Sequence, residues 1–434
     1  MPINDPDTRA LQSLAAKAAP GRRFIDHPDR EMAQAEIHAR PISRIQAPAR
    51  IRRIAFLLGQ NLHDIVAVRS RLVAYCLAAG VAPPAERDRR FSFAAAPHEV
   101  TWEFHTEFYT ATWISPFDNA DHWPTGIGLE AVGNEGVAVA VRVDVMASET
   151  ITSAALAGFD ELSLCYSDIE GGRAQLATDF VADHHGYTRY EMAAGTVGPY
   201  NLGAIVRRVL EIETYRVMSL IGITLARHVS PQLSRLEARL TEAMQAIGSS
   251  ASAAESHVLL ETMHDLQVAA AHTVELTRYR FGACQAYGDI LGQRLKNLDE
   301  RPNGEHRTLA RYLNHRVDPA LATFKAIQQR QTALFDQMAR STALLGTRIS
   351  LDIQTQNRHI LETISNTAQS QFRLQRTVEG LSTIAISYYI LGIVGYAFHV
   401  FDHSYEYEKT IAIALLAPLI VALVWLRMRR IHKH

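Results

Sequence analysis

Cysteine is scarce in this chain of 434 residues, and its spacing excludes the usual cysteine chemistry. The three cysteines, Cys76, Cys165 and Cys284, lie far apart, and no two of them are separated by only two residues. A disulfide framework or a zinc knuckle needs closely spaced cysteine pairs, so neither is indicated. We therefore expect three buried thiols in a reducing compartment.

An excess of one charge is also missing, because 44 Lys and Arg balance 45 Asp and Glu for a net charge of -1. Proteins that bind nucleic acid need a basic face to neutralise phosphates, so the sequence predicts no nucleic-acid partner. Catalytic motifs such as GxSxG and HExxH are absent, and Gly126 and Gly128 lack the third glycine and the lysine of phosphate-binding loops. The sequence names no catalytic residue and predicts that the protein is not an enzyme.

Long apolar runs are missing from most of the chain, and a mean hydropathy of -0.06 excludes a many-helix transporter. The first thirty residues contain no continuous apolar stretch, so no secretory signal is predicted. The exceptions are 381–400, whose twenty uncharged residues match a hydrocarbon core of roughly 30 Å, and the shorter but more apolar 411–426. We expect a hairpin of two transmembrane helices. The alternative is a buried hairpin in a soluble core.

Charged residues around these two runs predict their topology. Basic residues precede the first run and fill the tail 427–434, whereas the connecting segment carries Asp402, Glu406 and Glu408. By the positive-inside rule, both termini lie in the cytoplasm, and membrane lipid is a partner of the hairpin.

The remaining sequence divides by its patterning, and the fold class it predicts is α+β. Residues 1–50 form an arm without clean periodicity, and 51–198 alternate as strands around one helix. That region is expected to be a cytoplasmic α/β domain with a mixed or antiparallel sheet. Residues 199–380 are expected to form a long-helix stalk, a helical bundle or coiled coil, before the hairpin 381–426. Strands are expected at 51–59, 91–96, 100–114, 137–146 and on both sides of a turn at Glu170-Gly171-Gly172, and a helix at 63–79.

In the stalk, helices are expected at 201–228, from Pro231 to about 246, and at 255–298. Asp318-Pro319 is typical of a helix start, with an N-cap followed by proline at the first helical position. The helix that begins there is expected to run into the first membrane span, with an apolar seam of coiled-coil type. The alternative is two or three shorter helices packed as a bundle. The seam consists of Leu334, Met338, Leu345, Ile349, Ile360, Ile364, Leu374, Val378 and Leu381.

One strand carries a candidate metal site. The segment 99–113 places aromatic residues on one face and Glu103, His105 and Glu107 on the other. Histidine nitrogen and carboxylate oxygen suit zinc or manganese, so a divalent cation is the one candidate cofactor. The alternative is a solvated polar face. His184 and His185 follow Asp183 in a segment that is more typical of a turn.

The first membrane run contains more small and hydroxyl residues than a lipid anchor requires. Such residues can line a water-filled path, or they can pack the two spans together. If several copies surround an axis, Asp402, Glu406 and Glu408 would concentrate cations at an outer mouth. The pore-lining candidates are Thr383, Ser387, Gly392, Gly395 and Tyr396.

Four separated stretches carry a resemblance to a known family. They are EIHARP at 36–41, WEFHTEF at 102–108, LEIETYR at 210–216 and LQRTVEGLSTIAISYYILGIVGY at 374–396. Over nearly its whole length the chain resembles the domain of unknown function 3422 family of bacterial proteins with a predicted membrane anchor. The resemblance implies a protein tethered to the bacterial inner (cytoplasmic) membrane, with no established activity.

The order of parts also resembles the CorA-type magnesium channels, which have a cytoplasmic α/β domain, a long helix entering the first span, a second span and a basic tail. This resemblance implies a homo-oligomer, with a pentamer favoured, that acts as a cation channel or transporter. The Gly-Met-Asn motif of those channels corresponds to Gly395-Tyr396-Ala397 here, so Ala397 replaces the asparagine and magnesium selectivity does not carry over. The alternative is a membrane-tethered interaction or scaffold module that recruits a cytoplasmic partner.

Overall fold

The computed structural model describes residues 27, 29–30, 33–34, 42–59, 62–85, 88–119, 121–249, 253–400 and 406–431. They belong to two compact units, one drawn from Met1–Thr241 and Asp265–Gln337, the other from Glu242–His264 and Met338–His434. The EIHARP stretch lies outside the described residues.

The first unit is built on a mixed sheet, and nine strands belong to it among the described residues. The order across the sheet is β2-β3-β4-β1-β5-β8-β7-β6-β9, and only β5 and β8 pair in parallel. The predicted mixed sheet is confirmed. The strands are β1 Ala49–Leu57, β2 Arg90–Ala95, β3 His98–Phe104, β4 Phe108–Pro116, β5 Val137–Met146, β6 Cys165–Ile169, β7 Ala174–Thr178, β8 Thr188–Ala193 and β9 Arg301–Pro302.

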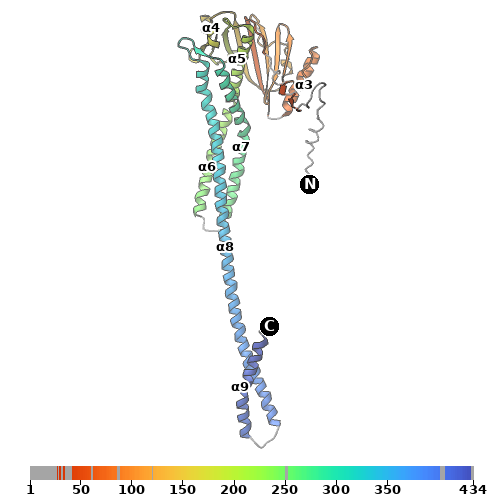
Figure 1. Ribbon diagram of the computed structural model, residues 1–434, viewed down its shortest axis with the longest axis vertical. Helices are drawn as coiled ribbons and strands as arrows, with labels where there is room; N and C mark the ends of the chain where they lie inside the picture. Colours follow the sequence, from red (N-terminus) through yellow and green to blue (C-terminus); the bar gives the residue numbers. More distant parts are fainter. Residues whose placement is uncertain are drawn as a thin grey trace. The chain divides into compact units, whose positions relative to one another are not determined.

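Helices cover both faces of this sheet (Figure 1). The long helices follow one another along the chain after β8, as the composition predicts. The helices are α3 Leu62–Ala78, α4 Ser153–Leu156, α5 Pro199–Leu220, α6 Ile223–Ser249, α7 Ala253–Lys296, α8 Leu309–Val400 and α9 Glu406–Ile431, with 3-10 turns η1 Leu129–Ala131 and η2 Glu170–Gly172.

Apolar and charged side chains alternate along the end of β5, and the apolar ones belong to the main hydrophobic core. Val141 and Val143 are fully buried on the face that α5 covers, while Arg142 and Asp144 point to the opposite face. The same core includes residues of α7 and α8, such as Leu295 and Leu313, so three helices complete one face of the sheet. Each buried aliphatic side chain stabilises the fold by about 1.5–3 kcal/mol.

Near β2, β3 and β4, the second face of the sheet has a core of its own. Trp102, Tyr109 and Trp113 are fully buried there beneath α3, which contributes Val68 and Leu72. Trp102 and Tyr109 stack with ring centroids 5.7 Å apart. The predicted helix at 63–79 is therefore confirmed, and its apolar side faces this aromatic layer.

Several predicted element boundaries are wrong. The strand expected at 100–114 is two strands, because residues 105–107 turn the chain back into an antiparallel hairpin of β3 with β4. The helix expected at 201–228 ends at Leu220, and Gly222 lies where an added Cβ would be 3.0 Å from the Sγ atom of Cys284. The turn at Glu170-Gly172 is confirmed, and these three residues have positive φ angles.

Two helix starts that were predicted from proline are wrong. Pro231 lies inside α6 and Pro319 lies inside α8, so neither begins a helix. The start of α8 is instead capped by Glu300, whose carboxylate oxygens accept hydrogen bonds from the backbone N–H groups of Leu309 at 3.0 Å and Ala310 at 2.9 Å. From there α8 continues for 92 residues as one helix, which excludes the alternative of several shorter helices.

Candidate functional site

The hairpin between β3 and β4 separates the three candidate metal ligands. Glu103 lies on β3, whereas His105 and Glu107 lie in the turn that follows it. His105 stacks on Phe108, with ring centroids 4.1 Å apart. Within the described ranges, no three His, Cys, Asp or Glu side chains are grouped closely enough to hold a metal ion.

Both carboxylates of that segment contact arginines. Glu103 accepts a hydrogen bond from Arg53 at 3.0 Å, and an oxygen of Glu107 lies 3.0 Å from Arg280. Burial raises the pKa of Glu103, but Arg53 and other nearby cations outweigh it, so this pKa lies below its ordinary value. These residues are therefore buried ion-pair partners rather than a solvated polar face.

The segment containing His184 and His185 is a turn, as the sequence favours. Asp183 accepts hydrogen bonds from the backbone N–H groups of His185 at 2.9 Å and Tyr187 at 3.0 Å, which closes the turn. The ring of His185 stacks on His122, with centroids 3.6 Å apart. The stacked rings of His122 and His185 therefore lie beside Asp183 and the charged face of the sheet.

A row of arginines crosses that second face. Arg52 pairs with Trp113 of β4 and Arg142 of β5, and Arg142 pairs with Arg189 of β8. Residues paired across neighbouring strands point to the same face, so the four side chains share it. Three arginines therefore lie on adjacent central strands of one sheet.

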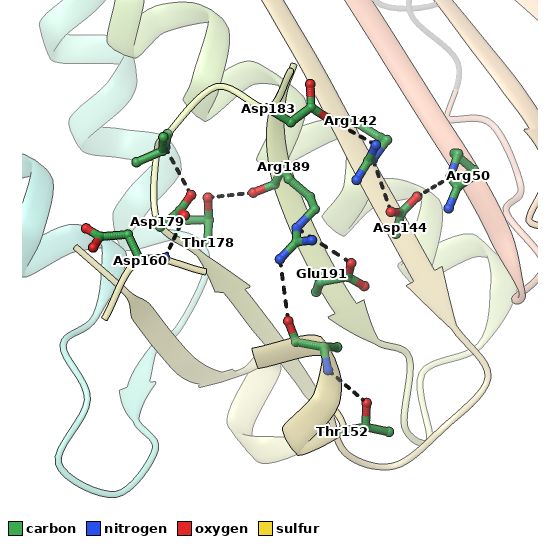
Figure 2. Close-up of polar contacts among 12 residues, drawn as sticks. Arg50, Arg142, Asp144, Thr152, Asp160, Thr178, Asp179, Asp183, Arg189 and Glu191 are labelled. Carbon is green, nitrogen blue, oxygen red and sulfur yellow. Dashed lines mark hydrogen bonds and ion pairs between the residues drawn. The ribbon is translucent and has the colours of Figure 1, made fainter. Parts of the chain in front are cut away.

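Carboxylates of the next row partly balance these charges (Figure 2). Asp144 lies between Arg50 and Arg142, with nitrogen–oxygen distances of 2.5 and 3.1 Å, and Arg142 also donates to Asp183 at 3.1 Å. Glu191 lies 3.9 Å from Arg189. Burial and the nearby Asp144 raise the pKa of Glu191 to about 7, and the neighbouring arginines do not offset this.

Sequence reasoning missed this charged face, although the strands carry a signal for it. Charged residues recur two apart within apolar strands, as Arg50 and Arg52 in β1 and Arg142 and Asp144 in β5. A spacing of two places both on one side of a strand. The signal could have been found by asking which face of each buried strand is charged.

Most of the apolar seam of α8 lies in the second unit. Leu334 belongs to the first unit and is buried, as are Met338 and Leu345 of the second. Farther along the helix the seam is exposed, for example Ile360 at 54% and Leu374 at 66%. This part of the helix therefore presents exposed apolar side chains.

The five pore-lining candidates lie on α8 but not on one face of it. At about 100° per residue, Thr383 and Ser387 lie within 40° of each other, whereas Gly392 and Tyr396 lie on the opposite side of the helix. The hydroxyl of Thr383 donates to the backbone oxygen of Glu379 at 2.8 Å, and that of Ser387 donates to Thr383 at 2.7 Å. Gly395 lies nearer to Gly392 than to the two hydroxyl residues.

Only part of the predicted membrane hairpin is described. Among the described residues, α8 alone is long and apolar enough to cross a membrane by length and composition. The apolar part of α9, Ile413–Arg427, is shorter. Asp402 lies outside the described residues. Glu406 and Glu408 lie in the first turn of α9.

The fold thus defines a class of protein: a mixed sheet covered by helices, followed by one very long helix and a shorter apolar one. Residues 25–434 match the family described as "Protein of unknown function (DUF3422)", and the chain belongs to this family. The family predicted from the sequence is confirmed. No curated protein matches the chain. Among solved structures, one match is "The complete structure of CorA magnesium transporter from Methanocaldococcus jannaschii". It is 11% identical, covers 69% of this chain and 92% of that chain, and has a TM-score of 0.17.

Proposed function

We propose that this protein is a membrane-anchored homo-oligomer of CorA-like architecture, in which α8 helices from several copies pair side by side and enclose a path for cations. The observation that carries the proposal is the exposure of the apolar seam of α8 from Ile360 onward. A helix of this length is not stabilised by propensity alone, and most helical stability comes from packing an apolar face. A second copy of α8 supplies that packing.

From Ile353 onward, the exposed part of the seam follows the seven-residue repeat of a coiled coil. Its two sets of positions recur every seven residues, beginning at Ile353 and Asn357, and they alternate at separations of four and three. A strict seven-residue repeat drifts about 20° per heptad on a straight helix and is kept in contact by a left-handed supercoil. The positions are Ile353, Ile360, Thr367, Leu374, Leu381, Tyr388 and Gly395 in one set, and Asn357, Ile364, Gln371, Val378, Ala385 and Gly392 in the other.

The same repeat continues without interruption into the apolar run that begins at 381. Gly392 and Gly395 fall on the seam, and an added Cβ at either glycine would meet no atom within 4 Å. Small residues at such positions let neighbouring helices approach closely. In an oligomer joined by this seam, Gly392 and Gly395 face the axis, and Thr383 and Ser387 face away from it.

The cation path is the finer part of the proposal. It is supported by the order of elements, which is that of the CorA-type channels, and by the acidic residues Asp402, Glu406 and Glu408 between the two apolar runs. We also place α9 in the membrane as the second span and both termini in the cytoplasm, with five copies as the expected number. The alternative is a membrane-tethered scaffold without transport, in which the same seam joins the copies and the same apolar helices anchor them.

The oligomer is tested with the full chain in detergent, by measuring particle mass with light scattering and native mass spectrometry. We expect a multiple of the chain mass for the wild type and dissociation for Ile360→Asp, because a carboxylate in the seam is costly to bury. Leu351→Asp is the matched control, since Leu351 is similarly exposed at 57% but lies off the seam. A monomeric wild type, or equal effects of both variants, contradicts the proposal.

Transport is tested separately in liposomes that contain the reconstituted full chain and a cation-sensitive dye. We expect cation flux down an imposed gradient, and a reduced flux when Gly392 is replaced by Leu, because the larger side chain narrows the axis. If the oligomer forms but carries no flux, and if an unrelated two-helix anchor preserves the cellular role, the scaffold alternative holds instead.

A further inference from the structure

A second site is indicated by Arg52, on the charged face of the sheet. Its side chain is fully buried, and its three guanidinium nitrogens meet no hydrogen-bond acceptor among the described residues. An ionised group taken out of water without a partner is among the most costly features a folded protein can contain. The structure therefore places a buried cation where a negative charge is needed.

The carboxylates that contact the neighbouring arginines are already engaged. Asp144 is shared by Arg50 and Arg142. Asp183 accepts from Arg142 and from two backbone N–H groups. Both carboxylates are thus held by Arg50, Arg142 or backbone N–H groups, and neither forms a hydrogen bond with Arg52.

Other donors around Arg52 are unpaired as well. The Nε1 atom of Trp113, the cross-strand neighbour of Arg52, is buried without an acceptor in the part of the chain that the structure describes. The Nδ1 atom of His122 is also buried and unpaired there. Burial lowers the pKa of Arg52, and Arg50 and Arg142 lower it further, although Asp144 opposes them. Burial also lowers the pKa of His122, and Arg52 is one of the cations that lower it further.

We propose that this face of the sheet binds a small oxyanion, a phosphate or carboxylate group, with Arg52 as its central ligand. The guanidinium is a planar fork that donates two parallel hydrogen bonds to two oxygens of such a group. A buried guanidinium that lacks an acceptor calls for an anion. Arg52 has no exposed surface, so the bound group is small. His122 and Tyr187 belong to the same neighbourhood, and the Tyr187 hydroxyl donates to the backbone oxygen of His122 at 2.9 Å.

The site belongs to the first unit and does not depend on the membrane or on the oligomer. It differs from the proposed cation path in the sign of the charge that it binds. Failure of one proposal therefore leaves the other standing.

The test uses the full chain in detergent, transferred to a phosphate-free buffer, and follows thermal unfolding while sodium phosphate is added against sodium chloride at equal ionic strength. A ligand that binds only the folded state raises the midpoint of unfolding, by roughly 5 °C at a hundredfold excess over its dissociation constant. We expect this shift for the wild type. Sodium acetate in a parallel series distinguishes a carboxylate from a phosphate as the preferred group.

Two Arg-to-Met variants separate binding from general salt effects. Arg52→Met is expected to lose the shift, and in phosphate-free buffer it unfolds at a temperature equal to or above that of the wild type, because an unpaired buried charge has been removed. Arg189→Met, from the same row of the sheet, is expected to keep the shift, since Arg189 contacts Glu191 and stacks over Phe159 at 3.9 Å. Equal shifts in the wild type and in Arg52→Met indicate the general stabilising action of phosphate and overturn the proposal.

A direct measurement does not depend on any variant folding. Equilibrium dialysis of the wild-type chain against radiolabelled phosphate, and in parallel against labelled acetate, is expected to give about one bound anion per chain. Binding of neither anion overturns the proposal.

Discussion

Asp144 and Glu191 are cross-strand neighbours on β5 and β8, but they differ in their contacts with arginines. Asp144 contacts two arginines at 2.5 and 3.1 Å, whereas Glu191 lies 3.9 Å from Arg189. Burial favours the neutral form of a carboxyl group, and only close cations reverse that preference. Glu191 therefore titrates near neutral pH while it is inside the fold.

Replacing Glu191 with Gln tests this at the scale of one residue. The folded-state pKa of about 7 lies above the unfolded value of 4.5, so the folded chain binds the proton more tightly. This contribution to stability is complete below about pH 4.5 and is lost as the pH rises through 7. Between pH 5 and pH 8, urea unfolding is expected to show the wild type losing on the order of 2–3 kcal/mol relative to Glu191→Gln. A difference that does not vary with pH would contradict the raised pKa.

Residue patterns predict burial better than they predict partners. The valines in 137–146 predicted a strand, and the structure places Val141 and Val143 in the core. Nothing in the order of residues said that Arg52 would lie beside Arg142, because that pairing depends on which strands become neighbours. The candidate site was missed for this reason.

At the scale of elements, proline was a misleading signal. Pro319 cannot donate a hydrogen bond, and within a helix proline costs about 3 kcal/mol. The helix continues nonetheless, because Val317 and Phe324 on either side of Pro319 are buried. Pro231 of α6 is likewise flanked by buried Val229 and Leu233. Packing outweighs local preference, and packing is not visible in a local window of sequence.

The true start of α8 depends on a residue nine positions before it. Replacing Glu300 with Ala leaves the N–H groups of Leu309 and Ala310 without their acceptors. We expect a loss of about 1–2 kcal/mol in the free energy of unfolding, the range for a lost helix cap. Asp318→Ala is the control and is expected to have little effect, since Asp318 is exposed inside the helix. If the two variants destabilise the chain equally, the capping role of Glu300 is wrong.

At the scale of the whole molecule, the proposed oligomer has its own specificity device. Asn357 and Gln371 occupy the same set of seam positions as Ile364 and Val378. A polar residue at such a position fixes the register and the number of helices at a cost in stability. We expect Asn357→Ile to yield a more stable assembly that contains more than one number of copies, as measured by native mass spectrometry. If the Asn357→Ile assembly keeps the single mass of the wild-type assembly, Asn357 does not determine the number of copies.

The sequence predicted the broad organisation of the molecule and its family, because composition changes sharply between strands, long helices and the apolar C-terminal runs. It did not predict β8, since TRYEMA at 188–193 has only weak alternation and gains its place by pairing in parallel with β5. It also could not predict which helices complete the sheet's core, because Leu295 and Leu313 are more than a hundred residues from the strands they cover.

The last strand of the sheet carries a consequence for biosynthesis. The side chain of Asn303, just after β9, donates to Asp168 of β6 at 2.9 Å, across a separation of 135 residues. At a synthesis rate of about 5–20 residues per second, roughly 7 to 27 s pass between the emergence of these two residues. Throughout that interval the sheet has an unfinished edge and lacks the leucines of α7 and α8 on one face. The nascent chain is thus most open to aggregation until the first turns of α8 leave the ribosome.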